Sequence, residues 1–337
     1  MDYKTLRSNA RERLKGCCRV CAVCDGRVCA GEVPGMGGAG TGGSFKANSR
    51  ALEAVRLAMR TLHGVKEVST HIDCFGLDLA SPVQVAPMTG VSYNMGGGMT
   101  EEEFARSVVD GATSAGTLAW TGDGADPTMF DSGLDAISAE GCTGVPIIKP
   151  RAQDEIIARI RRAEDAGAVA VGVDVDGAGL VTMAQFGQPV GPKSAEEIEE
   201  LVSATSLPFI LKGIMTVEEA EIAARTGCAA IVVSNHGGRV LDHTPGVAEV
   251  LPQVAEAVAG KLAIFADGAV RSGSDALKLL ALGADAVLVG RPVITGVFGG
   301  GAEGVSLVLE KMRAEMVQAM LLTGVATPAD ATHMILA

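Results

Sequence analysis

Aromatic side chains, long apolar runs and an excess of positive charge are all missing from this sequence of 337 residues. Phe, Trp and Tyr make up 3% of it, so a surface that stacks nucleic-acid bases is not expected. The net charge of -12 argues against non-specific binding to nucleic acid or to an anionic membrane. No apolar run reaches the roughly 18 residues of a membrane span. The charged residues 1–7 do not resemble a signal peptide, so a cytoplasmic location is expected.

What the sequence does contain is a repeated alternation of apolar, strand-like runs with amphipathic, helix-like segments from about residue 82 onward. The expected strands are 83–87, 117–121, 145–149, 169–174, 209–213, 230–234, 263–267 and 286–290, and the expected helices include 101–115, 154–166, 195–204, 217–225, 247–258, 274–282 and 304–322. Eight such units predict an α/β fold of the (β/α)8 TIM barrel type. A doubly wound open sheet is the alternative.

Residues 1–81 are expected to form an N-terminal extension to a barrel over residues 82–337. The extension contains a Cys-rich segment over 17–29, a Gly-rich loop over 35–43 and a predicted helix over 50–62. Residues that favour helix N-caps precede several of the barrel helices, namely Thr100, Ser194, Thr216 and Ser272.

Polar side chains follow the predicted strands, at the end of a barrel where chemistry gathers. They are Thr121, Lys149, Asp174, Lys212, His236 with Arg239, Asp267 and Arg291. A histidine exchanges a proton near neutral pH, and an arginine binds a carboxylate with two parallel hydrogen bonds. His236 and Arg239 are separated only by Gly237 and Gly238, which permit a ligand to approach closely.

Glycine-rich loops follow the last two predicted strands, at residues 266–273 and 290–292. The backbone N–H groups of such loops, together with a helix N-terminus, form a phosphate site. Arg271 and Arg291 add positive charge to it.

The run Ser234-Asn235-His236-Gly237-Gly238-Arg239 and the segment 265–292 resemble sequences of the FMN-dependent 2-hydroxy acid oxidase and dehydrogenase family, which includes glycolate and lactate oxidases. The resemblance covers roughly residues 48–323 and is strongest over 208–292. It implies oxidation of a hydroxyl-bearing, anionic substrate such as a 2-hydroxy acid, with a hydride equivalent passed to flavin N5. Homotetramers are common in that family, so an oligomer is expected by analogy.

The resemblance also implies roles for individual residues. His236 corresponds to the catalytic base, Asp174 to the carboxylate that orients it, Lys212 to the cation beside the flavin, and Arg239 to the group that binds the substrate carboxylate. The residues implied in cofactor binding are Pro87, Met88, Thr89, Thr121, Lys212, Ser234, His236, Gly238, Asp267, Gly268, Arg271, Gly290 and Arg291.

The substrate half of the family pattern is not retained. The third strand, ending at Lys149, lacks the family's glutamine and tyrosine. No second arginine follows Asp174, and the N-terminal tyrosine has no counterpart. A rebuilt substrate site is therefore expected. Asp123, Asp126, Lys149 and Asp176 are polar candidates for it, with solvated loop residues as the alternative interpretation.

Five of the eight cysteines lie between residues 17 and 29. Cys18, Cys21, Cys24 and Cys29 have the spacing C-x2-C-x2-C-x4-C, which suits a cubane iron–sulfur cluster better than zinc. Redox-active thiols without a metal are the other interpretation, and Cys17 is an alternative to Cys18 as a ligand. A cluster would give a reduced flavin a one-electron exit toward an acceptor protein. The Gly-rich loop is either a flexible linker or a cover over the flavin.

The sequence leaves two other functions open. One is a non-redox flavin enzyme, such as an isopentenyl-diphosphate isomerase of the flavin type, against which the His236 and Arg239 pattern argues. The other is a phosphate-binding barrel without catalysis. The placement of Asp174, Lys212 and His236 at successive strand ends argues against that one.

Overall fold

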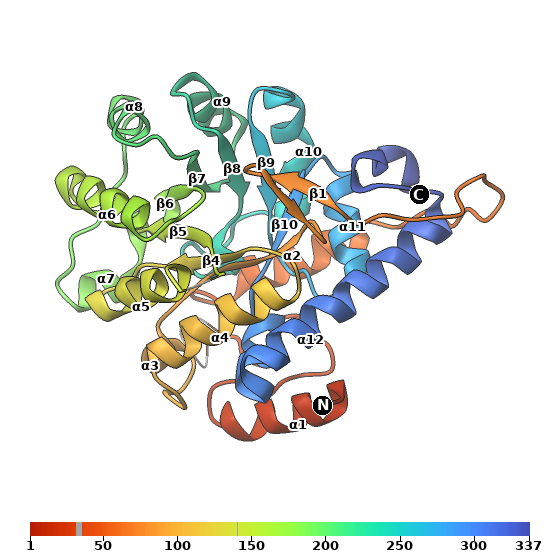
Figure 1. The fold of residues 1–337 in the computed structure, drawn as a ribbon, viewed down its shortest axis with the longest axis horizontal. Helices are drawn as coiled ribbons and strands as arrows, with labels where there is room; N and C mark the ends of the chain where they lie inside the picture. Colours follow the sequence, from red (N-terminus) through yellow and green to blue (C-terminus); the bar gives the residue numbers. More distant parts are fainter. Residues whose placement is uncertain (32–35, 140) are drawn as a thin grey trace.

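A closed barrel of eight parallel strands forms the centre of the molecule, with helices around it (Figure 1). The computed structural model describes residues 1–31, 36–139 and 141–337. The barrel strands are β3 (Val83–Met88), β4 (Ala119–Gly122), β5 (Gly144–Ile148), β6 (Val171–Asp174), β7 (Phe209–Ile214), β8 (Ala230–Val233), β9 (Ala263–Ala266) and β10 (Ala286–Val289). Each pairs with its sequence neighbours, and β10 closes on β3. The TIM-barrel prediction is confirmed, and the open-sheet alternative is wrong.

A hairpin of β1 (Ile72–Cys74) and β2 (Leu77–Leu79) packs against the interior of the barrel at the end where the strands begin. Phe75 of the hairpin stacks on Phe265, with ring centroids 5.8 Å apart, and Trp120 meets the edge of the same ring at 4.9 Å. These buried apolar groups fill the barrel from that end. The carboxyl ends of the strands are thereby left for the site.

The surrounding helices begin where local capping chemistry predicts. They are α4 (Glu101–Ser114), α5 (Pro127–Ile137), α6 (Gln153–Asp165), α8 (Ala195–Ser203), α9 (Val217–Arg225), α10 (Val247–Val258) and α11 (Gly273–Ala281), with short α3 (Val91–Asn94) and α7 (Val181–Gln185). Thr100 and Ser194 each form a reciprocal capping box with the glutamate three residues later. Helix α5 was not expected; Asp126 caps it by accepting a hydrogen bond from Thr128 N.

Helix α12 (Arg291–Thr323) is longer than the expected helix over 304–322. It consists of two helical parts separated by Gly300 and by Gly301, whose φ of +58° lies in the left-handed region. This helix is long and apolar enough to span a membrane, but 56% of its apolar 18-residue stretch is buried inside the molecule. It packs on α4 and α11 as a core helix.

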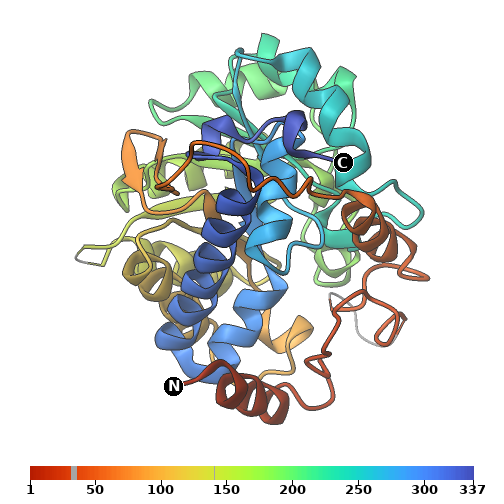
Figure 2. The ribbon, with the colours of Figure 1, turned by 90° about the vertical axis from the view of Figure 1, so that its right-hand side faces the viewer.

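The N-terminal extension packs on the last part of the chain. Helix α1 (Tyr3–Arg13) lies against α12, as Figure 2 shows at the N-terminus. Helix α2 (Gly43–Ala54) ends eight residues before the predicted end at Leu62, so the helix expected over 50–62 is wrong. Beyond it the backbone is extended because Leu57 forms a bridge with Leu336, and Ala58 N donates to Ile335 O at 2.7 Å. Pairing with the C-terminus outweighs the local helical pattern.

Candidate active site and cysteine cluster

Two neighbouring cavities lie at the carboxyl ends of the strands and share His236 and Arg239. The first cavity, of about 90 Å³, is lined by Met88, Lys212, Asp267, Gly268, Arg271, Gly290 and Arg291, among others. The second cavity, of about 50 Å³, is lined by Thr89, Tyr93, Lys149, Asp174, Leu180 and Met183, among others. Pro87 lines both. The expected polar ring at the strand ends is thus assembled around two adjoining spaces.

Asp174, at the end of β6, is the centre of a buried charge network. Its Oδ1 accepts a hydrogen bond from Lys212 Nζ at 2.9 Å, and its Oδ2 accepts one from Lys149 Nζ at 2.5 Å. Burial alone would raise the pKa of Asp174, but the nearby charges of His236, Lys149 and Lys212 outweigh it and hold that pKa well below its usual range. Burial alone would lower the pKa of Lys212, but the negative charges of Asp174, and to a smaller extent Asp176 and Asp267, raise that pKa above its usual value. Asp174 and Lys212 are therefore charged.

His236 contacts two carboxylates rather than one. Its Nδ1 lies 3.2 Å from Asp176 Oδ1, within hydrogen-bond distance, and 3.4 Å from Asp174 Oδ2. The family resemblance implies that Asp174 orients this histidine. The structure adds Asp176 because both Asp174 oxygens already accept hydrogen bonds from lysines. Burial and the neighbouring Asp174 raise the pKa of Asp176.

The room for Asp176 is created by a glycine in β7. The pairing of β7 with β8 shifts register between Lys212 and Ile214, and Gly213 there has a φ of +100°. A Cβ at Gly213 would lie 2.5 Å from Asp176 Cγ, so only glycine leaves the carboxylate its place. The sequence indicates Asp176 only as a candidate for the substrate site. Its position two residues after Asp174 is the one sequence signal for a role beside His236.

His236 itself has a φ of +58°, an uncommon conformation for a residue with a side chain. Ser234 stabilises it, because its Oγ accepts a hydrogen bond from His236 N at 3.0 Å and donates one to Asp267 Oδ2 at 2.7 Å. Ser234 thus positions two residues of the site without lining either cavity.

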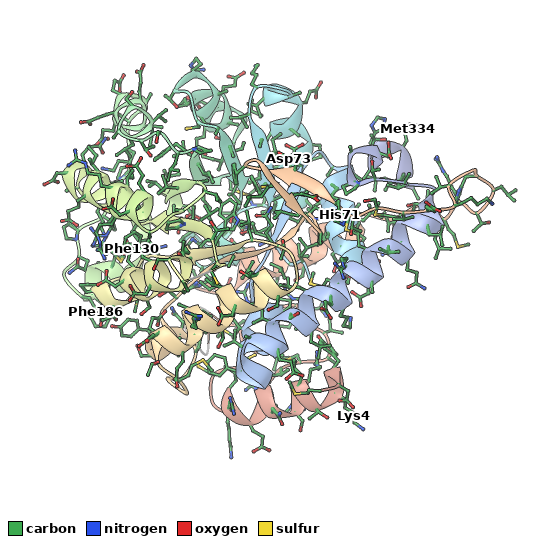
Figure 3. All side chains as sticks on the ribbon, in the orientation of Figure 1. Lys4, His71, Asp73, Phe130, Phe186 and Met334 are labelled. Atoms are coloured by element: carbon green, nitrogen blue, oxygen red, sulfur yellow. The ribbon has the colours of Figure 1, made fainter. Side chains whose placement is uncertain are left out.

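Arg239 is a partly buried guanidinium beside His236, and its Nε is buried with no hydrogen-bond partner among the described residues. Burial lowers the pKa of Arg239, although Asp174 and Asp176 oppose that shift. Lys149 and Tyr93 line the same cavity. The Tyr93 ring packs on Phe186, with centroids 4.7 Å apart, and Phe186 is at the periphery in Figure 3. An unpaired arginine facing a cavity with a lysine fits a small anion.

The first cavity has unpaired groups suited to a phosphorylated, hydroxyl-rich ligand. Asp267 Oδ1 and Arg271 Nη2 are buried without a partner among the described residues. Burial, followed by the charge of Arg271, lowers the pKa of Arg291 to about 10, so a phosphate would relieve this repulsion. Gly290 stands directly before α12, whose N-terminus favours an anion. These groups fit FMN, for which Asp267 would hold the ribityl chain and both arginines the phosphate, as the family resemblance implies.

The Gly-rich loop covers the first cavity. Met36 lines that cavity, Arg291 Nε donates to Met36 O at 3.2 Å, and Ala39 N donates to Gly238 O at 2.7 Å. The structure favours the cover over the linker interpretation for residues 36–43. Gly35 lies outside the described residues.

Besides Ser234, two more of the expected cofactor residues line neither cavity. The Thr121 side chain packs beside Gly133 of α5 and lines neither cavity. Gly238 is buried under α2. A Cβ at this position would lie 2.4 Å from Phe45 N, so a glycine is needed here for α2 to pack closely. Of the other polar candidates, Asp123 binds Arg151 in a buried pair at 2.9 Å, and Asp126 caps α5.

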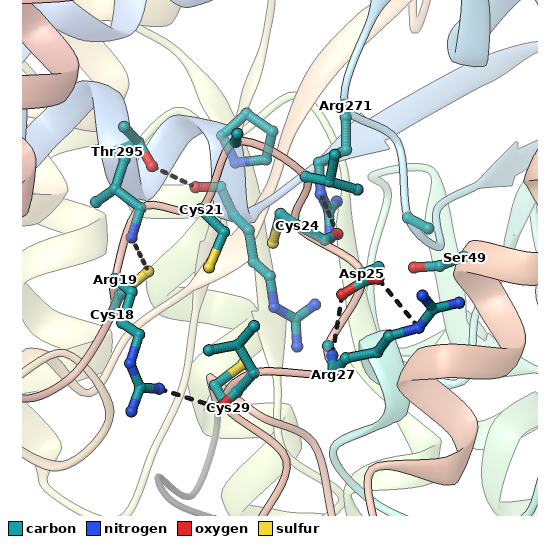
Figure 4. A pocket seen from close by; sticks show the side chains of 18 of the residues that line it. Cys18, Arg19, Cys21, Cys24, Asp25, Arg27, Cys29, Ser49, Arg271 and Thr295 are labelled. Carbon is teal, nitrogen blue, oxygen red and sulfur yellow. Dashed lines mark hydrogen bonds and ion pairs between the residues drawn. The ribbon is translucent and has the colours of Figure 1, made fainter.

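The four cysteines of the predicted set lie together at the surface, where their sulfur atoms face a shared space (Figure 4). Burial, with the nearness of Cys24, Cys21 and Cys29, raises the pKa of Cys18. Cys17 also lines this space, but its Sγ lies 3.6 Å from Asn94 O, which favours Cys18 as the member of the set. Arg271 Nε donates to Cys24 O at 3.3 Å, which ties this segment to the first cavity.

The spacing of the sulfur atoms bears on the metal. Among the residues that the structure describes, Asp174, Asp176 and His236 form the one group of three or more metal-ligating side chains whose donor atoms all lie within 4.8 Å of one another. The cysteine sulfurs do not form such a group. They are therefore spaced more widely than in a zinc site, where Zn–S bonds of about 2.3 Å place the sulfurs roughly 3.8 Å apart. The Asp174 group is no metal centre, because lysines already occupy both Asp174 oxygens.

Comparisons with known proteins agree with this geometry. The family model described as FMN-dependent dehydrogenase matches residues 35–187 and 179–337. The chain is 36% identical to 4-hydroxymandelate oxidase of Amycolatopsis orientalis, over 86% of this chain and 88% of that protein. It is 30% identical to L-lactate oxidase of Lactobacillus jensenii, over 86% and 77%. A crystal structure of mandelate oxidase superposes with a TM-score of 0.81 at 31% identity, covering 99% of this chain and 97% of that one.

A (β/α)8 barrel with these strand-end groups is a flavin-dependent oxidoreductase. The chain belongs to the FMN-dependent dehydrogenase family. The expected family and the expected FMN dependence are confirmed, and the two alternatives without redox chemistry are not supported.

Proposed function

We propose that this protein oxidises a small 2-hydroxy acid to the corresponding 2-oxo acid. The observation that carries the proposal is the unpaired guanidinium of Arg239 beside His236, in a cavity that adjoins the site suited to FMN. FMN, when bound, supplies the acceptor for the two electrons of the substrate. His236 accepts the substrate proton, and Asp174 and Asp176 stabilise the imidazolium that results. The relatives named for lactate and 4-hydroxymandelate oxidation support this substrate class.

Lys149 is the second cation that we assign to the substrate carboxylate, in place of the arginine that the sequence lacks. It stands at the end of β5, lines the second cavity with Arg239, and is 8% exposed. We expect Lys149→Ala to raise KM at least tenfold, since a charged hydrogen bond is worth about 1.5–3 kcal/mol. Lys149→Arg, which keeps the charge against Asp174, should restore part of the loss. Lys193→Ala, at a lysine paired with Glu197 outside the cavity, is the control.

The decisive experiment is a visible absorption spectrum of anaerobically purified protein during addition of a panel of L-2-hydroxy acids. A flavin spectrum that bleaches with one of them supports the proposal and identifies the substrate class. A flavin spectrum that none of them changes contradicts it and favours a non-redox flavin reaction such as an isomerisation.

We further propose that Cys18, Cys21, Cys24 and Cys29 hold a cubane iron–sulfur cluster. Three observations support it: the sequence spacing, the shared space that the sulfur atoms face, and the surrounding cations, which favour an anionic group. The cluster, when bound, supplies one-electron transfer. Zinc and metal-free redox thiols are the competing interpretations.

Iron and acid-labile sulfide, measured in anaerobically purified protein, test this assignment. We expect both in the wild type and neither in Cys21→Ser. Cys17→Ser is the matched control and should keep its iron, since Cys17 faces Asn94. Stoichiometric zinc, or fresh protein with neither metal, would contradict the cluster.

Three further proposals concern the electron acceptor, the cellular location and the oligomeric state. We propose that electrons leave through the cluster to an acceptor protein, so oxygen is not required. We also propose a cytoplasmic homo-oligomer, a tetramer by analogy, with residues 1–81 as an extension of the barrel. Light scattering of the purified holoprotein measures its oligomeric state.

A further inference from the structure

The segment around the cysteines has a charge opposite to that of the rest of the chain. Residues 1–50 contain nine Lys and Arg against four Asp and Glu, a net charge of +5 in a chain of net charge -12. The remaining 287 residues therefore carry -17. The cavity of about 680 Å³ beside the cysteines is lined by Arg271, Arg291 and Lys278, by the acidic Asp25, Glu53 and Asp275, and by six further basic residues, Arg7, Arg19, Arg27, Lys46, Arg50 and Lys311. We call the last six residues the basic face.

At this face Arg27 pairs with Asp25 at 3.2 Å and Lys311 pairs with Glu315, whereas Arg7 is held by backbone carbonyls. Arg7 Nη2 donates to Val20 O at 2.9 Å and to Cys21 O at 2.8 Å. The neighbouring Arg11, which does not line the cavity, donates to Arg19 O and Val20 O. Neither Arg7 nor Arg11 has a carboxylate partner among the described residues. Their positive charge is fixed in position by carbonyls without being neutralised.

Exposed apolar side chains accompany this charge. Val23 is 73% exposed and Val28 is 51% exposed, and both line the same cavity between the cysteines. Figure 4 shows Arg19 and Arg27 beside Cys18 and Cys29. A small apolar centre with a charged rim is the usual composition of a protein docking site.

We propose that the basic face docks an acidic protein that carries one electron at a time. This inference rests on the proposed cluster. Oxidation of one hydroxyl to a carbonyl releases two electrons and two protons, so each turnover reduces two carrier molecules by one electron each. Charge complementarity selects the acidic carrier and accelerates its encounter. A redox-active ligand set directly beneath the face favours an electron carrier over nucleic acid or an anionic membrane.

The test uses iron-loaded holoprotein, a 2-hydroxy acid that bleaches its flavin, and three acceptors: an acidic b-type cytochrome, a basic c-type cytochrome and an uncharged quinone. We expect the acidic cytochrome to be reduced faster than the basic one at low salt, with the advantage lost at high ionic strength. The double variant Arg27→Glu with Arg50→Glu should slow reduction of the acidic cytochrome at least tenfold. Reduction of the quinone should not change.

The control is Arg161→Glu, a charge reversal at an exposed arginine of α6 that does not line the cysteine cavity. It should leave all three rates unchanged. Equal rates for the double variant and the wild type with the acidic cytochrome, or a preference for the basic cytochrome, overturn the docking proposal alone. Salt-sensitive binding of duplex DNA or anionic vesicles, with cytochrome rates unaffected by the double variant, assigns the face to those ligands instead. Quinone reduction with no reduction of either cytochrome overturns the proposed electron exit itself.

Discussion

The strand ends of β6, β7 and β8 and the cysteine segment handle charge in opposite ways. At the strand ends, Asp174 lies within 2.9 Å of both Lys149 and Lys212, and His236 Nδ1 lies 3.2 Å from Asp176. At the cysteine segment, arginines surround thiols and bond to backbone carbonyls. The first region is neutralised from within, apart from Arg239. In the second region Asp25 pairs with Arg27, and Arg7 has no carboxylate partner among the described residues.

The largest effect is expected from a substitution that changes the strand-end site and leaves the cysteine segment intact. His236→Ala removes the proton acceptor and should lower the rate of flavin reduction by about 10²–10⁴-fold. FMN and iron content should be unchanged, because the phosphate side and the cysteines keep their contacts. Stopped-flow reduction with the identified substrate measures this, and wild-type turnover in the variant would contradict the mechanism.

Asp174→Asn should mainly destabilise the fold. It leaves Lys149 and Lys212 buried without their counter-charge, a change that costs about 3–5 kcal/mol. Because the pKa of Asp174 in the folded state lies below its unfolded value, its stabilisation is present above about pH 4 and is lost as the pH falls through the folded pKa. Urea unfolding of wild type and variant between pH 3 and pH 7 should show the difference shrinking toward acid pH. A difference that does not depend on pH would contradict this account.

Asp176→Asn isolates the second carboxylate at His236. We expect roughly a tenfold loss in kcat/KM, which corresponds to about 1.4 kcal/mol of lost imidazolium stabilisation. Stopped-flow flavin reduction measures this loss, and a wild-type rate in the variant would contradict the role of Asp176.

Gly213→Ala should have the smallest effect. A side chain at φ +100° costs about 1–2 kcal/mol, and the new Cβ would press on Asp176. We expect a several-fold loss in kcat/KM. Gly179→Ala is the matched control, because nothing lies within 4 Å of its Cβ position. Equal activity of the two variants would show that Asp176 does not depend on the β7 irregularity.

The sequence predicted the barrel well because each strand is a short apolar run that ends in a polar residue, as at Asp174 and Asp267. Helices with explicit caps, such as those after Thr100 and Ser194, were also predictable. The helix over 50–62 was not, since Leu57 pairs with a segment 279 residues later. Tertiary contacts of that range leave no local signal.

The candidate site was predictable to a similar degree. The strand-end positions of Lys212, His236 and Arg239 followed from the pattern, and the structure brings them together. Gly238 and Thr121 did not follow, because their surroundings are set by Phe45 and Gly133 on other elements. The partnership of Asp176 with His236 depends on the irregular backbone at Gly213, which alternation of apolar residues does not reveal.

The contact of α1 with α12, and of Cys24 with Arg271, has a consequence for biosynthesis. Helix α1 is synthesised before the barrel, and helix α12 after the last barrel strand. The cysteine segment therefore has no finished surface to pack against until α12 has been made, so insertion of a cluster would follow completion of the barrel. Loss of α12 would then appear first as a defect at the cysteine segment.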